Sequence, residues 1–155
     1  MKNMKIMFVC HGNICRSPMA EFIMRSLLEE SGLAPQCTVA SSATSTEEIG
    51  NPVYPPARRE LARHGLSCDG KYAVQLGRSD YDKYDLFLVM DDNNLRNIRR
   101  IFPEDPDGKV RKLLSFAGRD GNVADPWYTR DFEATWRDVE DGCRGLLMYL
   151  TAEQP

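Results

Sequence analysis

The amino-acid sequence predicts an α/β fold, a three-layer sandwich in which helices cover both faces of a central parallel sheet of about four strands in a flavodoxin-like layout. Continuous apolar runs at residues 5–10 and 85–90 are typical of strands that are buried on both faces. Segments with helical periodicity alternate with the expected strands, as in crossovers between parallel strands. A length of 155 residues, 42% of them hydrophobic, suits one globular domain, which we expect to span residues 1–155.

The first half of the chain contains two expected strands and two expected helices. The apolar run at residues 5–10 ends in a glycine-containing loop. Ser17 is then the expected N-cap of a helix with Pro18 in its first turn, and apolar residues recur at helical spacing until a glycine ends the helix. A second strand is expected at residues 38–43. A polar, proline-containing loop then leads to a helix at residues 57–64.

The second half repeats the alternation of strand and helix. The run at residues 85–90 is the other strongly buried strand, and a helix is expected to follow at residues 94–101. Residues 109–116 form a weaker strand. A loop that contains residues 125–128 then precedes a last helix at residues 132–149. No repeat or low-complexity segment interrupts this pattern, which is why we expect a single domain.

Charge and cysteine content exclude several classes of protein. A net charge of −3 and a pI near 5.4 argue against general nucleic-acid binding. No apolar run approaches the roughly 20 residues of a membrane-spanning helix, so we expect a cytoplasmic protein without membrane contact, and a monomer. The five cysteines are odd in number and scattered, as in a reducing compartment. Cys10, Cys15, His11 and His64 do not complete a zinc ligand set, and no metal is expected.

The stretch CHGNICRS at residues 10–17 predicts an anion-binding loop. Ligands of open α/β sheets bind outside the carboxyl ends of the strands, and Cys10 ends the first strand. Backbone N–H groups of the loop and of the helix N-terminus can surround an oxyanion, of which Arg16 can bind two oxygens. This positive field favours the thiolate form of Cys10, a nucleophile directed at phosphorus. The residues expected to contact the ligand are His11, Gly12, Asn13, Ile14, Cys15 and Ser17.

Asp125 is the best candidate for the proton donor that the departing oxygen of a phosphate ester needs. Pro126 stiffens its loop, and the rings of Trp127 and Tyr128 are placed to line a pocket for a flat substrate. Taken alone, an Asp-Pro pair is also typical of an ordinary turn. Asp91 and Asp92 face the same sheet edge and are rivals for the acid role, but we expect them to brace the loop and cap the following helix, because they lead straight into it.

The chain resembles the low-molecular-weight protein tyrosine phosphatase family. The resemblance is carried by VCHGNICRSP at residues 9–18 and by DPWY at residues 125–128. Residues 42–45, 49–52 and 89–91 also fall where that family has similar segments, so the similarity extends over nearly the whole chain.

The resemblance implies hydrolysis of phosphotyrosine in proteins, or of small aryl phosphates, through a phosphocysteine intermediate and without a cofactor or metal. It implies that Cys10 is the nucleophile, that Arg16 binds phosphate, and that Asp125 is the general acid and then the base. It also implies that the phosphate loop is held by Asn13, Ser17 and Ser42.

Two positions depart from the family pattern. His11 occupies a place that is often apolar or small, and we expect its side chain to point to solvent. Glu47 falls where many members carry an aromatic wall of the substrate cleft. We therefore expect Trp127 and Tyr128 to form the cleft wall, and the Glu47 carboxylate to lie near the mouth.

Two other functions remain open at this point. An arsenate reductase of the same fold needs further cysteines as an electron relay, and Cys37, Cys68 and Cys143 are widely spaced. A catalytically silent phosphoprotein-binding module is the other alternative, which the presence of all the expected catalytic residues disfavours.

The loop also predicts a redox-sensitive cysteine. Cys15 follows Cys10 around the loop, so both sulfurs are expected near its base. Mild oxidation of Cys10 is then expected to end in a disulfide between the two.

Overall fold

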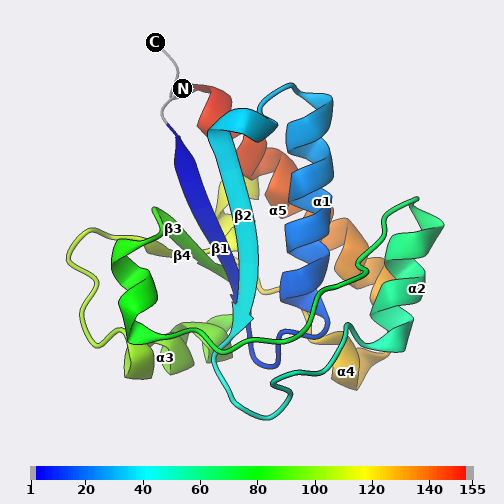
Figure 1. Cartoon of the computed structure of the whole chain (residues 1–155), viewed down its shortest axis with the longest axis horizontal. Helices are drawn as coiled ribbons and strands as arrows, with labels where there is room; N and C mark the ends of the chain where they lie inside the picture. The colour runs from blue at the N-terminus through cyan, green and yellow to red at the C-terminus, as the bar shows by residue number, and fades with distance from the viewer. Residues whose placement is uncertain (1–2, 153–155) are drawn as a thin grey trace.

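Four parallel strands form the central sheet of the computed structural model, which describes residues 3–152 (Figure 1). The strands are β1 (Met4–Cys10), β2 (Cys37–Ala43), β3 (Leu86–Val89) and β4 (Val110–Lys112). Their order across the sheet is β2-β1-β3-β4, and every neighbouring pair is parallel. The predicted fold class is confirmed. The expected domain range of 1–155 extends beyond the described residues at both ends.

Helices and short 3-10 turns connect the strands. The α-helices are α1 (Arg16–Glu30), α2 (Pro55–Arg63), α3 (Asp92–Ile101), α4 (Pro126–Thr129) and α5 (Phe132–Ala152). The 3-10 helices are η1 (Ala34–Gln36), η2 (Arg78–Asp82) and η3 (Leu113–Ala117). Within residues 3–152, no helix is long and apolar enough to span a bilayer.

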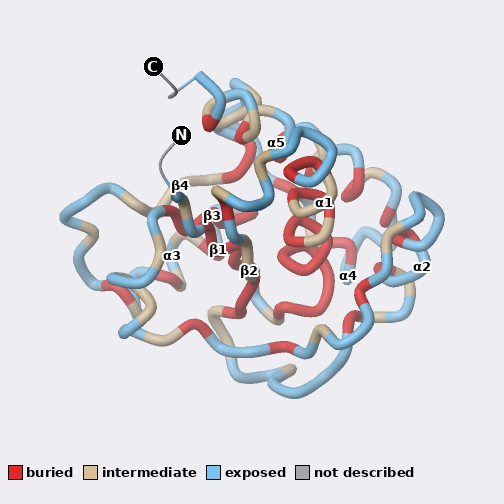
Figure 2. The backbone as a smooth tube through the Cα atoms, turned by 45° about the horizontal axis from the view of Figure 1, so that its top comes forward, coloured by how far each residue is buried: buried red, intermediate tan, exposed pale blue. Residues whose placement is uncertain are grey.

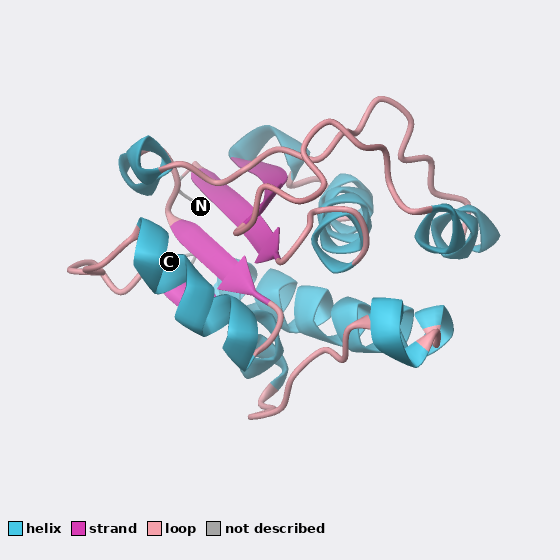
Figure 3. Ribbon diagram, turned by 90° about the horizontal axis from the view of Figure 1, so that it is seen from below, coloured by secondary structure: helices cyan, strands magenta, loops and turns pink. Residues whose placement is uncertain are grey.

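The two faces of β1 are buried in two different cores, as a strand with a side-chain period of two requires. Ile6, Phe8 and Cys10 face the core that includes residues of α1 and α5. Met7 and Val9 face the smaller core that includes residues of α3. Figure 2 shows buried backbone in the strands and in much of α1, and Figure 3 shows the strands surrounded by helices. The continuous apolar run of this strand follows from burial on both faces.

The start of α1 differs from the prediction. Ser17 lies inside the helix, and Cys15 is the N-cap residue, without a side-chain capping bond. The expectation that Ser17 caps the helix is therefore wrong. The physical reason is that the Ser17 hydroxyl faces inward and lies 3.0 Å from the Cys10 sulfur.

The region after β3 contains two further differences. The strand predicted at residues 109–116 is shorter in the structure, where only β4 is a strand. The chain turns into η3 after β4, because Leu113 and Leu114 are buried in the core that also contains residues of α5. Gly118, at φ 71°, ends that turn in a conformation that favours glycine. The short helix α4 was not expected, since its four residues are too few to show a helical period.

Close packing of α5 on η3 makes Gly145 a testable position. A Cβ atom at Gly145 would overlap the backbone carbonyl of Phe116. Although alanine is favoured over glycine inside a helix by about 1 kcal/mol, overpacking against backbone costs about 1–3 kcal/mol. We expect Gly145→Ala to lower the free energy of unfolding, measured by urea denaturation. Gly121→Ala, with no atom within 4 Å of the added Cβ, is the control and should change it little. Equal stability of Gly145→Ala and the parent would contradict this packing argument.

Candidate active site

The site lies where the order of the strands reverses. β1 has β2 on one side and β3 on the other, although the chain visits them in sequence. In sheets of this kind a crevice opens at the carboxyl ends of the strands that flank the reversal. Cys10 is the last residue of β1, and Asp91 follows β3. The loop of residues 11–15 crosses this edge and leads into α1.

Hydrogen-bonding groups surround the Cys10 sulfur. The side chain is buried, with 3% exposure of the residue. The backbone N–H of Asn13 donates to Sγ at 3.3 Å, and the Ser17 hydroxyl lies 3.0 Å from it. The Asn13 N–H is a donor to the sulfur, and the Ser17 hydroxyl can donate to it when the sulfur is a thiolate.

Asn13 holds the loop in its curved form. Its backbone has φ 59°, a left-handed conformation that asparagine tolerates better than most residues. Its side-chain amide donates to the hydroxyls of Ser17 (2.8 Å) and Ser41 (3.0 Å), and its carbonyl oxygen accepts the Val74 N–H at 3.1 Å. The loop geometry thus depends on a buried side chain as well as on the backbone.

The support behind the loop includes residues that the sequence pattern does not single out. Ser42 contributes its carbonyl oxygen, which lies 3.4 Å from the Ser17 hydroxyl, while its own hydroxyl has no hydrogen-bond partner within residues 3–152. The supporting hydroxyl belongs instead to Ser41, which donates to the buried carboxylate of Glu21 at 2.6 Å. A glutamate in an amphipathic helix carries no sequence signal that it faces inward.

Arg16 is buried, with 2% exposure, and its charge is compensated on several sides. Its NH1 group donates to Asp91 Oδ2 at 2.6 Å and to the Val123 carbonyl at 2.8 Å, and NH2 lies 3.4 Å from Asp125 Oδ2. Burial by itself would lower the pKa of Arg16, but the charges of Cys10, Asp91 and Asp125 raise it above its ordinary value. A positive charge is therefore held permanently beside Cys10.

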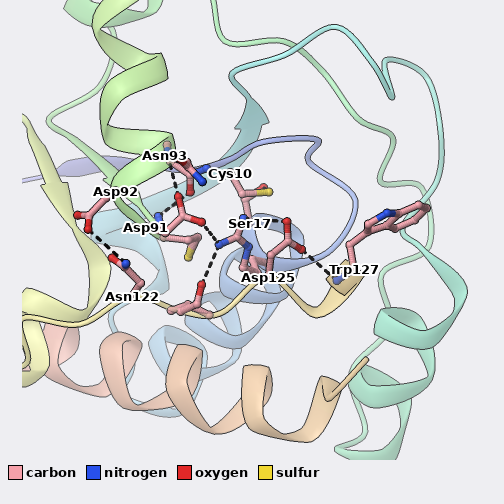
Figure 4. Close-up of polar contacts among 12 residues, drawn as sticks. Cys10, Ser17, Asp91, Asp92, Asn93, Asn122, Asp125 and Trp127 are labelled. Carbon is pink, nitrogen blue, oxygen red and sulfur yellow. Dashed lines mark hydrogen bonds and ion pairs between the residues drawn. The ribbon is translucent and has the colours of Figure 1, made fainter. Parts of the chain in front are cut away.

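The two aspartates beside the guanidinium each cap a helix with one oxygen and face Arg16 with the other, but they differ in their distance from Arg16 and in their exposure. Asp91 accepts the Asn94 N–H at 2.8 Å as the N-cap of α3, and its other oxygen binds Arg16. Asp125 is the N-cap of α4 and accepts the Trp127 N–H at 3.0 Å, and its side chain is 27% exposed. Figure 4 shows both carboxylates close to Cys10 and Ser17. Asp91 therefore lies closer to Arg16, and Asp125 is the more accessible of the two carboxylates.

A pocket opens above the cysteine loop. It is lined by Cys10, His11, Gly12, Ile14, Cys15, Arg16, Glu47, Glu48, Asp125, Trp127 and Tyr128. The Trp127 ring packs against Tyr54, with centroids 4.8 Å apart, whereas Tyr128 is 81% exposed. Trp127 is therefore the fixed part of the aromatic wall, and Tyr54, which was not predicted, supports it.

His11 is exposed as expected, with 49% of its side chain accessible, and it also has a partner within the chain. Its Nε2 atom forms a hydrogen bond with Glu47 Oε2, and both residues line the pocket. The reason is that the chain after β2 folds back over the cysteine loop, where the Ser45 N–H and hydroxyl donate to the His11 carbonyl at 3.1 and 2.8 Å. Glu47 lies at the mouth as expected, but as the partner of a histidine.

The remaining cysteines lie in buried positions. Burial, with the charges of Cys10 and Asp125 adding to it, raises the pKa of Cys15 far above its ordinary value. Burial likewise raises the pKa of Cys37 to about 11 and that of Cys143 further still. Within residues 3–152 no group of three or more His, Cys, Asp or Glu side chains is arranged to hold a metal ion.

This fold and site define an α/β protein with a buried cysteine at the start of a tight loop and a buried arginine at its end. The model of the low molecular weight phosphotyrosine protein phosphatase family matches residues 5–155, and the chain belongs to that family. It is 34% identical to the low molecular weight protein-tyrosine-phosphatase YfkJ of Bacillus subtilis, over 96% of this chain and 97% of the relative. It is 36% identical to PtpA of Staphylococcus epidermidis, over 96% and 94%.

Solved structures agree with this membership. The crystal structure of YfkJ superimposes with a TM-score of 0.94 and covers 100% of this chain and 99% of the other. The low molecular weight protein tyrosine phosphatase of Streptococcus pyogenes gives a TM-score of 0.87 at 36% identity, covering 99% and 96%. The predicted family is confirmed.

Proposed function

We propose that Cys10, Arg16 and Asp125 hydrolyse phosphotyrosine in proteins, or small aryl phosphates, through a phosphocysteine intermediate. The observation that carries this proposal is the surroundings of Cys10 Sγ, which lies 3.0 Å from Ser17 Oγ and 3.3 Å from the Asn13 nitrogen in a pocket that Arg16 and Asp125 also line. The phosphocysteine route is general for the family to which the chain belongs.

In the first step the Cys10 thiolate attacks phosphorus, a P–S bond forms, and the P–O bond to the aryl group breaks. Asp125 gives its proton to the departing phenolate oxygen. Arg16 is held by Asp91 and by the Val123 carbonyl on one nitrogen, so its other N–H groups can bind the equatorial oxygens of the phosphoryl group.

In the second step water attacks phosphorus from the side that the phenol has left. Asp125, now ionised, takes a proton from this water, the P–S bond breaks, and phosphate and the Cys10 thiolate are released. The Asn13 N–H and the Ser17 hydroxyl stabilise the sulfur as a leaving group.

The aromatic wall supports a preference for aryl over alkyl esters. Trp127, packed on Tyr54, provides a face on which a phenyl ring can stack while its phosphate reaches Cys10. The substrate class that fits is a phosphotyrosine-containing protein. We further propose that the protein acts as a cytoplasmic monomer, without nucleic-acid or membrane partners, in accord with its net charge of −3 and five free thiols.

The burial of the other cysteines favours a phosphatase over an arsenate reductase. Cys37 begins β2 beside Met4, at the opposite end of the sheet from Cys10. Cys68 and Cys143 are buried, and the Cys143 thiol contacts the Ala20 carbonyl at 3.8 Å. None of the three lines the pocket. Hydrolysis of p-nitrophenyl phosphate that persists in chelator separates the phosphatase from a reductase and from a silent binding module, and no hydrolysis would overturn the proposal.

Cys10→Ser tests the nucleophile. Serine is not ionised at neutral pH, so we expect kcat for p-nitrophenyl phosphate to fall by more than about 1000-fold. Binding of inorganic phosphate, measured by calorimetry, should persist because the donors of the loop remain. Cys68→Ser, outside the pocket, is the matched control and should retain turnover. Appreciable turnover by Cys10→Ser would contradict the assignment.

Asp125→Asn tests the general acid. Only leaving groups with a high pKa need the proton, so the variant should slow phenyl phosphate by about 100-fold or more, and slow aryl esters with good leaving groups much less. The measurement is kcat over a leaving-group series. Asp120→Asn, on an exposed loop, is the control. Equal slowing across the series would remove Asp125 from the acid role.

Peroxide tests the redox behaviour of the loop. Peroxide transfers oxygen to the Cys10 thiolate, which gives sulfenic acid and hydroxide. The Cys15 sulfur then attacks the Cys10 sulfur, the S–O bond breaks, and the hydroxyl group leaves as water with the Cys15 proton. Because burial raises the pKa of Cys15, that residue is a thiol at neutral pH and should not be oxidised first. Peptide mapping should find a Cys10–Cys15 disulfide and activity that a thiol reductant restores. The Cys15→Ser variant should instead lose activity irreversibly, and equal reversibility in both would refute the disulfide.

A further inference from the structure

A second hollow lies beside the active-site pocket, and Tyr54 separates the two. On one side the Tyr54 ring packs against Trp127 of the pocket, with centroids 4.8 Å apart. On the other side its hydroxyl accepts a hydrogen bond from Arg130 at 3.1 Å. Arg130 lines the second hollow together with Arg59 and Arg63 of α2. Figure 1 shows α2 and α4 at the end of the molecule where the cysteine loop lies.

The carboxylates of this hollow already have partners within the chain. They are Glu60 with Arg63 and His64, Glu133 with Arg137, and Asp131 with the backbone N–H of Ala134. Arg59 and Arg130 differ from them, since within residues 3–152 neither forms an ion pair, and both are exposed. The hollow therefore presents two guanidinium groups to solvent without a carboxylate of their own.

The length of α4 sets the distance between this hollow and the active-site pocket. Asp125, in the pocket, is the N-cap of α4, and Arg130 is its C-cap. Five residues at a helical rise of about 1.5 Å span about 8 Å. An extended peptide covers that distance in two or three residues at about 3.3 Å each. The length of an arginine side chain extends the range by about one further peptide residue.

We propose that Arg59 and Arg130 form a subsite for an acidic side chain of the substrate, two to four residues from the phosphotyrosine on one side of it. The inference rests on the proposed phosphotyrosine phosphatase function and names which substrates that site prefers. A guanidinium group matches a carboxylate in geometry and charge. General electrostatics cannot produce this preference, because the chain carries a net charge of −3 and the pocket mouth carries Glu47 and Glu48.

The test uses a set of phosphotyrosine peptides whose other residues are uncharged. Each peptide carries one aspartate, placed at one of the four positions before or the four positions after the phosphotyrosine. Each peptide is paired with its asparagine counterpart, and the ratio of the two kcat/KM values is measured, so that any change in chemistry itself cancels. In the parent we expect this ratio to reach about threefold to tenfold at positions two to four on one side, the effect of one or two exposed ion pairs. It should decline in high salt.

Arginine variants show which side chain produces the preference for aspartate. Arg59→Gln should bring the ratio close to one, and Arg59→Glu should bring it below one. Arg100→Gln, an exposed arginine of α3 without an ion pair among the described residues, makes the same change in net charge and should leave the ratio as in the parent. A parent ratio of one or less at every position would overturn the subsite, as would an equal loss in Arg59→Gln and Arg100→Gln. Failure to hydrolyse even the neutral peptides would instead overturn the phosphatase function itself.

Discussion

The compensated charge of Arg16 is the interaction on which the site depends. A buried guanidinium without partners would cost several kcal/mol, and removal of one partner of a buried pair is strongly destabilising. Asp91, Asp125 and the Val123 carbonyl compensate it, and they come from the segments that follow β3 and precede α4. Arg16 itself begins α1. One side chain thus joins the cysteine loop to the segments that carry Asp91 and Asp125.

A second buried network keeps the cysteine loop in its anion-binding shape. Asn13 and Ser41 link the loop to Glu21, whose carboxylate is bound by Arg25 at 2.6 Å and faces Lys71 at 3.8 Å. Burial lowers the pKa of Lys71, and the charge of Glu21 offsets this only in part. The donors that face the Cys10 sulfur are consequently in place before substrate arrives, which is the condition for strong electrostatic stabilisation of a transition state.

Arg16 provides a buried positive charge in the pocket, although the chain has a negative net charge and the pocket mouth carries two glutamates. The chain carries −3 overall, yet in the proposed function the binding of a phosphate dianion depends on Arg16 and the loop N–H groups inside a pocket, where a low dielectric strengthens each interaction. The contact of 3.4 Å between Arg16 and Asp125 is long for a hydrogen bond, so phosphate oxygens can take the guanidinium N–H groups in its place. Tyr54 then connects this pocket to the exposed arginines beside it.

The sequence by itself determined the sheet, the strand that ends at Cys10, and the loop with Arg16 after it, because two-sided burial and an anion-binding turn are both properties of consecutive residues. It also placed Asp91 correctly as a helix cap. Only the tertiary structure decided that Ser17 lies inside α1 instead of capping it, that Ser41 and Glu21 support Asn13, and that His11 meets Glu47. These contacts join residues far apart in the chain, and which of several polar side chains fills a buried position depends on strand register and loop packing, for which no local periodicity exists.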